Sequence, residues 1–193
     1  MSATRIVMLG DSLTAGYGLA PADALPVQLE RELRGRGHEV DVANAGVSGD
    51  TTADGLRRLD RDVPPHAQLC IVALGANDMM QMVAPDRIAA NLDAILGKLR
   101  AMAIPALLTG MRAPPWFGPY ASAFDRLFAD AARRQGVAFD PFLLEGVALN
   151  PLYTLADRIH PNALAVQRIA RRMAPVVVEL LPATKPSDPV DIV

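Results

Sequence analysis

Apolar residues along this chain form short uninterrupted runs that alternate with stretches of helical spacing. Uninterrupted runs are typical of strands buried on both faces, and helical spacing is typical of helices with one buried face. The runs predict five strands, over residues 5–9, 39–44, 69–74, 104–109 and 137–140. The spacing predicts helices over residues 21–34, 51–63, 85–102, 120–135 and 162–180.

Strands that alternate with helices predict the fold class. Five such strands indicate an α/β protein in which a parallel sheet lies between two helical layers, a three-layer α/β/α sandwich. The chain has 193 residues, and we expect one domain over residues 1–182. Residues 183–193 have no apolar periodicity and are expected to form a loose tail. We expect Pro175 to kink or shorten the last helix, because proline lacks the N–H that a helix interior uses.

Composition limits the classes of partner. The formal net charge is −2, so the chain lacks the broad basic surface that suits nucleic acid or anionic lipid. No apolar run approaches the ~20 residues that cross a bilayer, so we expect no integral membrane segment. No signal peptide is recognised, which predicts a cytoplasmic protein, or a periplasmic or secreted one if a leader has been removed. The lone cysteine, Cys70, lies inside a predicted strand and is expected in the core.

The first candidate for chemistry is Ser12, in the stretch Gly10-Asp11-Ser12-Leu13. It follows the first predicted strand at a glycine, where the chain turns into a helix. The hydroxyl of a serine at such a turn can point outward, and the first N–H groups of a helix have no partner within it. Both features suit a nucleophile that generates an oxyanion, although serine also serves as a simple helix cap.

The other candidates also follow predicted strands. Gly49 follows the second strand, Asn77 the third and Trp116 the fourth, and Asp157 and His160 follow the fifth. Ligands bind beyond the carboxyl ends of the strands in a parallel sheet. We therefore expect these residues to share one site.

Asp157 and His160 suit a catalytic pair. Over three residues an aspartate can reach the histidine Nδ1–H, fix the tautomer and stabilise the imidazolium. Together with Ser12 they give the expected triad, in the order Ser, Asp, His. The alternative is that Asp157 caps a turn or pairs with Arg158.

Three groups are candidates for oxyanion donors. They are the backbone N–H groups of Ser12 and Gly49 and the side-chain amide of Asn77. A tight turn at Gly49 and a loop-stabilising hydrogen bond from Asn77 are the alternatives. The two other histidines, His38 and His66, are expected in solvated loops.

Four short motifs in order resemble the sequence blocks of the SGNH hydrolases, also called GDSL esterases. The motifs are Gly10–Leu13, Ser48–Thr51, Gly75–Asp78 and Asp157–His160. The resemblance runs from about residue 5 to residue 181 and is greatest to a bacterial branch of thioesterases, lysophospholipases and arylesterases. It implies a flavodoxin-like fold and a serine esterase that uses no metal and no other cofactor.

The resemblance also implies roles for individual residues. Ser12 would be the nucleophile, His160 the base and Asp157 its orienting partner, and Ser12, Gly49 and Asn77 would form the oxyanion hole. Two positions depart from the pattern of the thioesterase-like members, which often have glycine where this chain has Ala76 and Arg158. Neither is a catalytic group, but Arg158 would place a cation at the rim of the site.

The expected substrates are small-molecule esters with short to medium acyl chains or aryl groups, and also thioesters or lysophospholipids. Apolar side chains in the loops would line an acyl or aryl groove, while packing under the next helix is the alternative for the methionines. These side chains are Met79, Met80, Met82, Trp116 and Phe117.

Three rival functions remain. A carbohydrate acetylesterase of the same family would accept acetylated sugars and ignore longer acyl chains. A metal-dependent phosphoester hydrolase would use Asp11, Asp50, Asp78 and His160 as ligands, but it lacks a clear second histidine. A non-catalytic flavodoxin-like module, which binds flavin or accepts phosphate, leaves the Asp157–His160 pair without a use.

Overall fold

A single parallel sheet forms the centre of the computed structural model, which describes residues 3–182. Its strand order is β2-β1-β3-β4-β5, the order of the flavodoxin-like doubly wound folds. The strands are β1 (Thr4–Gly10), β2 (Val40–Gly46), β3 (Leu69–Ala73), β4 (Ala106–Thr109) and β5 (Ala138–Asp140). All neighbouring strands pair in parallel, so their carboxyl ends lie at one edge.

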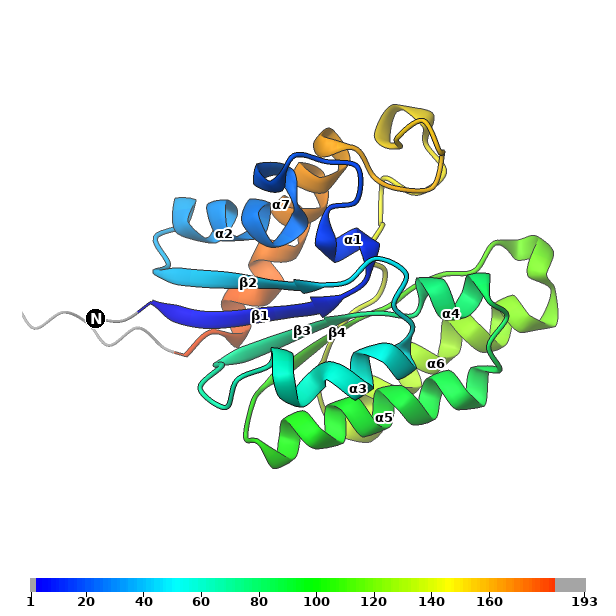
Figure 1. Ribbon diagram of the computed structural model, residues 1–193, viewed down its shortest axis with the longest axis horizontal. Coiled ribbons are helices and arrows are strands. Elements are labelled where there is room, and N and C mark those ends of the chain that lie inside the picture. The colour runs from blue at the N-terminus through cyan, green and yellow to red at the C-terminus, as the bar shows by residue number, and fades with distance from the viewer. Residues whose placement is uncertain (1–2, 183–193) are drawn as a thin grey trace, which may run out of the picture.

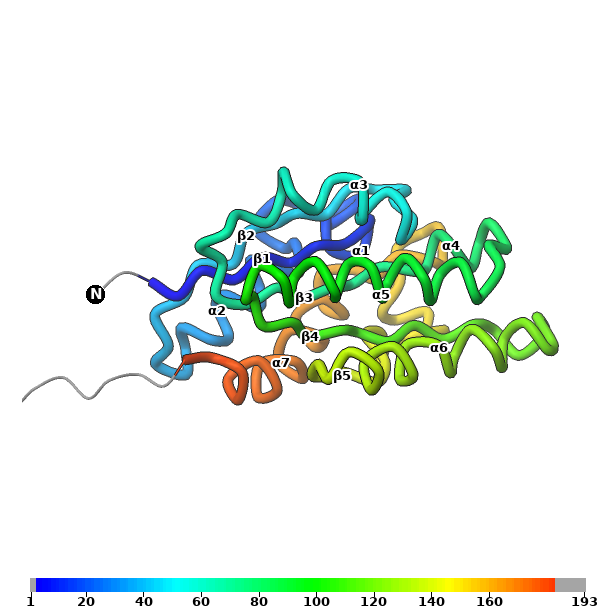
Figure 2. The backbone as a smooth tube through the Cα atoms, turned by 90° about the horizontal axis from the view of Figure 1, so that it is seen from below, coloured from blue at the N-terminus to red at the C-terminus, as the bar shows by residue number. Residues whose placement is uncertain are grey.

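Helices cover both faces of this sheet (Figure 1). The α-helices are α1 (Ser12–Ala15), α2 (Leu25–Gly35), α3 (Thr52–Asp62), α4 (Ala76–Met80), α5 (Pro85–Ala101), α6 (Pro119–Gln135) and α7 (Ala163–Leu180). α2 and α7 pack together on one face, and α3, α5 and α6 lie side by side on the other, as Figure 2 shows from below. The three-layer α/β/α prediction is confirmed.

Several boundaries differ from the predicted ones. The helix predicted over residues 21–34 is a 3₁₀ turn, Pro21–Asp23, followed by α2. Ala24 between them is extended, and Pro26 occupies the first turn of α2, where the missing N–H of proline has no helical partner to lose. β2 extends two residues further than predicted, because Ala45 and Gly46 pair with the end of β1.

Two short helices lie where the apolar pattern predicted only a turn and a loop. α1 has four residues and α4 has five. Segments this short span little more than one turn, so no 3.6-residue periodicity can be read from them. Both begin within three residues of the end of a strand, and they therefore place their first residues at the carboxyl edge of the sheet.

Of the two effects expected of Pro175, a kink or a shortened helix, the shortening does not occur. α7 continues through it to Leu180. A proline removes the hydrogen bond to the carbonyl four residues earlier, here that of Arg171. Pro175 and Arg171 are both exposed, so water can bind that carbonyl.

The core fills the spaces between the sheet and both helical layers. β3 is buried over its whole length, and Cys70 within it is fully buried as predicted. Burial raises the pKa of the Cys70 thiol to about 12, so this side chain is an apolar packing group at neutral pH. Within residues 3–182 no helix has the length and apolar character needed to span a membrane. The predicted tail, 183–193, lies outside the described residues.

The close approach of β2 and α1 gives a test of this packing. A Cβ on Gly46 would lie 2.3 Å from the backbone N of Ala15, so the Gly46→Ala variant must displace α1. We expect it to cost about 1–3 kcal/mol and to lower the melting temperature by about 3–10 °C. The same displacement should move Ser12, because α1 carries this residue.

Gly35→Ala is the matched control, measured by the same thermal unfolding. A Cβ on Gly35 meets nothing within 4 Å, and its position at the end of α2 favours alanine. This control should unfold at the wild-type temperature or above. Equal melting temperatures for the two variants would show that the contact between β2 and α1 is not tight.

Candidate active site

Ser12 is the first residue of α1 and lies two residues after the end of β1 at Gly10. Asp11 caps this helix, since its Oδ1 accepts a hydrogen bond from the N–H of Leu13 at 2.9 Å. Gly16 ends the helix in the left-handed conformation, with φ of 83°. The strand and the two caps therefore fix Ser12 on a single turn of helix.

The structure brings Ser12, Asp157 and His160 together in one chain of hydrogen bonds. His160 Nδ1 lies 2.6 Å from Asp157 Oδ2, and His160 Nε2 lies 3.0 Å from Ser12 Oγ. Ser12 and His160 are 148 positions apart in the sequence. The arrangement is the one that the sequence predicted for these three side chains.

The ionisation of Asp157 decides which nitrogen of His160 carries the proton. The pKa of the Asp157 carboxyl is lowered to about 2 by hydrogen bonds from the N–H of Ile159, from His160 Nδ1 and from the N–H of His160. A carboxylate accepts hydrogen bonds only, so Nδ1–H is the donor to Asp157. In the neutral imidazole Nε2 is then the acceptor, and the Ser12 hydroxyl donates to it.

A short closed loop presents the Asp157–His160 pair. Thr154 and Pro161 form an antiparallel bridge, and the N–H of Leu155 donates to the carbonyl of His160 at 2.8 Å. Inside this loop Asp157 Oδ1 accepts from the N–H groups of residues 159 and 160, at 2.9 and 3.0 Å. Asp157 does form a turn with its own loop, as the alternative proposed, and it binds His160 at the same time.

The candidate oxyanion donors lie just beyond the carboxyl ends of three adjacent strands, β2, β1 and β3. Asn77 Nδ2 donates to the carbonyl of Asp50 at 2.9 Å, which joins it to the residue after Gly49. A side-chain amide has two N–H groups, so the second stays available. Among the described residues, the N–H groups of Ser12 and Gly49 donate to no other protein atom. Gly49 has a φ of +90°, which residues other than glycine rarely adopt.

Asp78 joins the segment that follows β3 to the segment that follows β2. Its carboxylate accepts from the N–H of Thr52 at 2.8 Å and from the Thr52 hydroxyl at 2.6 Å. Asp78 is 1% exposed, and burial raises its pKa despite the bonds from Thr52. Because Thr52 begins α3, this contact sets the position of α4, and hence of Asn77, relative to the Gly49 loop.

Asp11 is a buried carboxyl group next to Ser12. It is 0% exposed, and within residues 3–182 its Oδ2 has no hydrogen-bond partner. Burial raises its pKa to about 7, partly offset by the N–H of Leu13 and the nearby charge of His160. The side chain therefore carries a large desolvation cost when it ionises.

Sequence reasoning did not identify Tyr17 as a functional residue. Its ring centroid lies 4.4 Å from that of His160, with 36° between the ring planes. The contact covers one side of the imidazole and restricts its rotation. The only signal in the sequence was an aromatic residue shortly after the Ser12 helix, and it gives no indication of a partner 143 residues away.

The apolar loop residues divide into two groups. Met79 and Phe117 pack against the core, which for Met79 supports the packing alternative given for the methionines. Met80, Met82 and Trp116 are exposed, Trp116 by 72%. Met80 is the last residue of α4 and Met82 follows this helix, while Trp116 lies in a 3₁₀ turn after β4, at the edge that carries Ser12.

The ligands that the metal-dependent alternative requires do not assemble. Asp11 caps α1, Asp50 binds Arg58, Asp78 binds Thr52, and His160 binds Asp157. In the part of the chain that the structure describes, no three acidic, histidine or cysteine side chains form a cluster that fits a metal ion. His38 and His66 precede β2 and β3, so they lie at the opposite edge.

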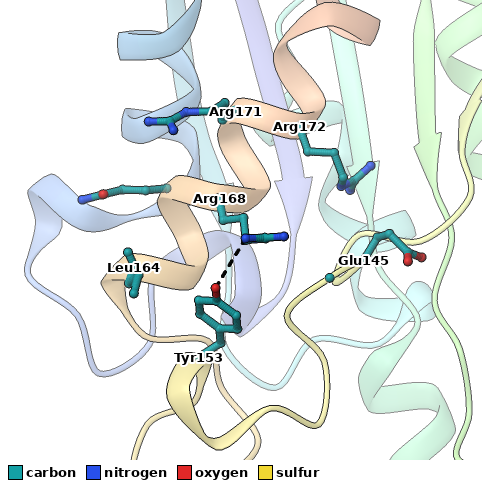
Figure 3. A pocket seen from close by; sticks show the side chains of 8 residues that line it. Glu145, Tyr153, Leu164, Arg168, Arg171 and Arg172 are labelled. Carbon is teal, nitrogen blue, oxygen red and sulfur yellow. Dashed lines mark hydrogen bonds between the residues drawn. The ribbon is translucent and has the colours of Figure 1, made fainter.

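A surface groove lies beside α7 (Figure 3). Its lining is Glu145, Gly146, Tyr153, Leu164, Gln167, Arg168, Arg171 and Arg172, and contains none of the predicted site residues. Most of its charges already have partners: Arg172 binds Asp140 at 2.6 Å, and Arg171 approaches Glu32 at 3.5 Å. Arg168 lies over the Tyr153 ring. The groove therefore lacks a concentration of uncompensated charge.

Comparisons with known proteins agree with this geometry. Residues 8–186 match the GDSL-like Lipase/Acylhydrolase family. The chain belongs to this family. It is 35% identical to Esterase TesA of Pseudomonas aeruginosa over 93% of its own length and 90% of that protein. It is 34% identical to Thioesterase 1/protease 1/lysophospholipase L1 of Escherichia coli, over 90% and 83%.

The fold of this GDSL hydrolase is also found in solved structures. That of AlinE4, an SGNH-hydrolase family esterase, has a TM-score of 0.79 and 40% identity, and the match covers 95% of this chain and 99% of that one. The family and its esterase members identify the protein as a serine carboxylic ester hydrolase. The predicted family, fold and reaction class are confirmed.

Replacement of Asp11 should change how the stability of the esterase depends on pH. Between about pH 4 and pH 7 the folded chain keeps a proton on Asp11 that the unfolded chain releases, so the free energy of unfolding falls as pH rises. The rise in pKa from 3.8 to about 7 corresponds to a loss of about 4 kcal/mol by pH 8.

Asn does not titrate, so the Asp11→Asn variant should lose much less stability between pH 4.5 and pH 8. Urea unfolding at several pH values measures this difference, and Asp86→Asn, at an exposed position, is the control. Parallel pH profiles for wild type and Asp11→Asn would contradict the raised pKa.

Proposed function

We propose that Ser12 is the nucleophile of this esterase, His160 its general base and Asp157 the residue that orients and stabilises His160. The observation that carries this proposal is the continuous chain of hydrogen bonds from Asp157 through His160 to Ser12 Oγ. A base must lie within hydrogen-bond reach of the proton it removes, and 3.0 Å meets that requirement.

The proposed reaction passes through an acyl-enzyme. Ser12 Oγ attacks the ester carbonyl while His160 Nε2 takes its proton, and the imidazolium is stabilised by the ionised Asp157. His160 then protonates the departing alcohol, which leaves the acyl group on Ser12. Water, deprotonated by the same nitrogen, attacks the acyl-enzyme, and His160 returns the proton to Ser12 Oγ as the acid leaves. The N–H groups of Ser12 and Gly49 and the amide of Asn77 hold the oxyanion in both halves of the reaction.

The substrates that suit this edge of the sheet are esters or thioesters with short to medium acyl chains or with aryl groups. Met80 and Met82 are more than half exposed and lie at the C-terminal end of α4, the helix of Asn77, where an apolar chain can pack against them. The names of the similar proteins include esterase, thioesterase and lysophospholipase. These activities define the range to be tested.

Loss of Ser12 or His160 tests the proposed triad. Ser12→Ala and His160→Ala should each lower kcat for p-nitrophenyl butyrate by about 10⁴-fold, and the double variant should be little worse, because the two side chains act as a unit. A fluorophosphonate should label wild type on Ser12, as mapped by mass spectrometry. Retained activity in Ser12→Ala, or a label on another residue, would refute the proposal.

Acyl-chain preference tests the proposed substrate class. The value of kcat/KM for p-nitrophenyl butyrate and octanoate should exceed that for palmitate, and Met80→Ser should lower the value for octanoate by about 3- to 10-fold through lost apolar contact. Leu164→Ser, at an exposed position in the α7 groove, is the matched control. Turnover of acetylated sugars alone would favour a carbohydrate acetylesterase.

A further inference from the structure

Arg58 of α3 is a buried arginine that joins the ends of two strands to the Gly49 loop. Its Nη2 donates to the carbonyl of Gly10 at 2.7 Å, and its Nη1 to the carbonyl of Ala45 at 2.8 Å. Its Nε donates to the Asp50 carboxylate at 2.5 Å. The side chain is 8% exposed. These bonds meet at the edge of the sheet that carries the active site.

Two of the partners of Arg58 are close in the chain to groups proposed to bind the oxyanion. Gly10 precedes Ser12 by two residues, and Asp50 directly follows Gly49. Asp50 has a second contact, because its carbonyl accepts from Asn77 Nδ2 at 2.9 Å. The Arg58 guanidinium is therefore connected to all three donors, to Ser12 through Gly10 and to Gly49 and Asn77 through Asp50.

The bonding pattern requires a guanidinium group. Three different nitrogens of Arg58 are used, and Nη1 also donates to Asp62 Oδ2 at 2.7 Å. Arginine offers five N–H groups in a rigid plane, whereas lysine offers three from a single nitrogen. A lysine at this position would keep the charge but could not reach both strand ends and Asp50 together.

We infer that Arg58 is a positioning residue for the oxyanion hole. Through Gly10 and Asp50 it holds the N–H of Gly49 and the amide of Asn77 in a fixed relation to Ser12. Such donors act only when they already point to the place where negative charge develops. The inference rests on the proposed function, and it assigns Arg58 no contact with the substrate.

Arg58→Lys tests this role against a simple contribution to folding. With a soluble p-nitrophenyl ester, kcat should fall by about 10- to 100-fold while KM changes by less than about 3-fold, because the lost interaction belongs to the transition state. A fluorophosphonate should still label one Ser12 per folded chain, but more slowly. Unchanged kcat in the folded variant would overturn the inference.

Arg61→Gln is the matched control. Arg61 lies on the same helix and binds the same Asp62 carboxylate, at 2.6 Å, but it is exposed and contacts neither strand end. This control should keep the wild-type kcat and KM. An equal loss of kcat in both variants would show that the effect comes from Asp62 or α3 and would overturn the inference.

Asp50→Asn provides a second variant in case Arg58→Lys does not fold. It weakens the contact with Arg58 and leaves the Asp50 carbonyl that Asn77 binds. Its kcat should fall by about 5- to 50-fold. In an Asn77→Ala background the additional loss from either variant should be smaller than in wild type, since part of the same hole is already absent.

If either variant lowered kcat by the same factor in the Asn77→Ala background as in wild type, the inference would be overturned. Its failure is also distinguishable from failure of the proposed function. If wild type is labelled at Ser12 and Arg58→Lys and Asp50→Asn both retain full kcat, only the role of Arg58 is wrong. If wild type is not labelled at Ser12, the triad itself is wrong, and the role of Arg58 with it.

Discussion

The contact between His160 Nε2 and Ser12 Oγ, 3.0 Å across, is the constraint on which the rest of the structure depends. The two residues come from separate parts of the chain: Ser12 follows the end of β1, and His160 lies in the loop before α7. A displacement of one ångström would break the bond and remove the geometry that proton transfer needs. α7 resists such a displacement because Arg172 binds Asp140 through two bonds, of 2.6 and 2.9 Å, at the end of β5.

Buried polar groups are concentrated at the carboxyl edge of the sheet. Asp11, Asp78 and Asp140 are each at most 2% exposed, and all three lie at or just after a strand end. Burial of charge destabilises a fold unless a partner compensates, and Asp11 Oδ2 has none among the described residues. The rest of the core is apolar and compact. Packing of the strands and helices away from this edge therefore offsets the destabilisation that the buried carboxyl groups cause.

The apolar pattern was sufficient for the five strands, the main helices and the edge on which the candidates meet. It could not give the strand order, because a periodicity contains no information about which strands are neighbours. It missed α1 and α4, which are too short to show a period. The three residues of the proposed triad were predictable because a serine after a strand and an Asp-x-x-His pair have their own chemistry.

Arg58 and Tyr17 were not predictable in the same way. Arg58 lies in a helix with many charges, and only the fold shows that it points inward to Gly10 and Ala45. Nothing in the sequence distinguishes it from Arg57 or Arg61, which are more than 70% exposed. Tyr17 depends on a contact with His160 that only the closure of the fold creates.

Arg158 shows how the loop that presents Asp157 and His160 limits its own sequence. Its φ is +60°, in the left-handed region where a side chain costs about 1–2 kcal/mol relative to glycine. This conformation turns the chain so that the N–H groups of Ile159 and His160 both reach Asp157 Oδ1. The strain is therefore retained by the same bonds that orient His160. The Arg158 side chain is exposed, so its burial does not offset the cost of the left-handed backbone. Folding stability therefore does not account for arginine at this position.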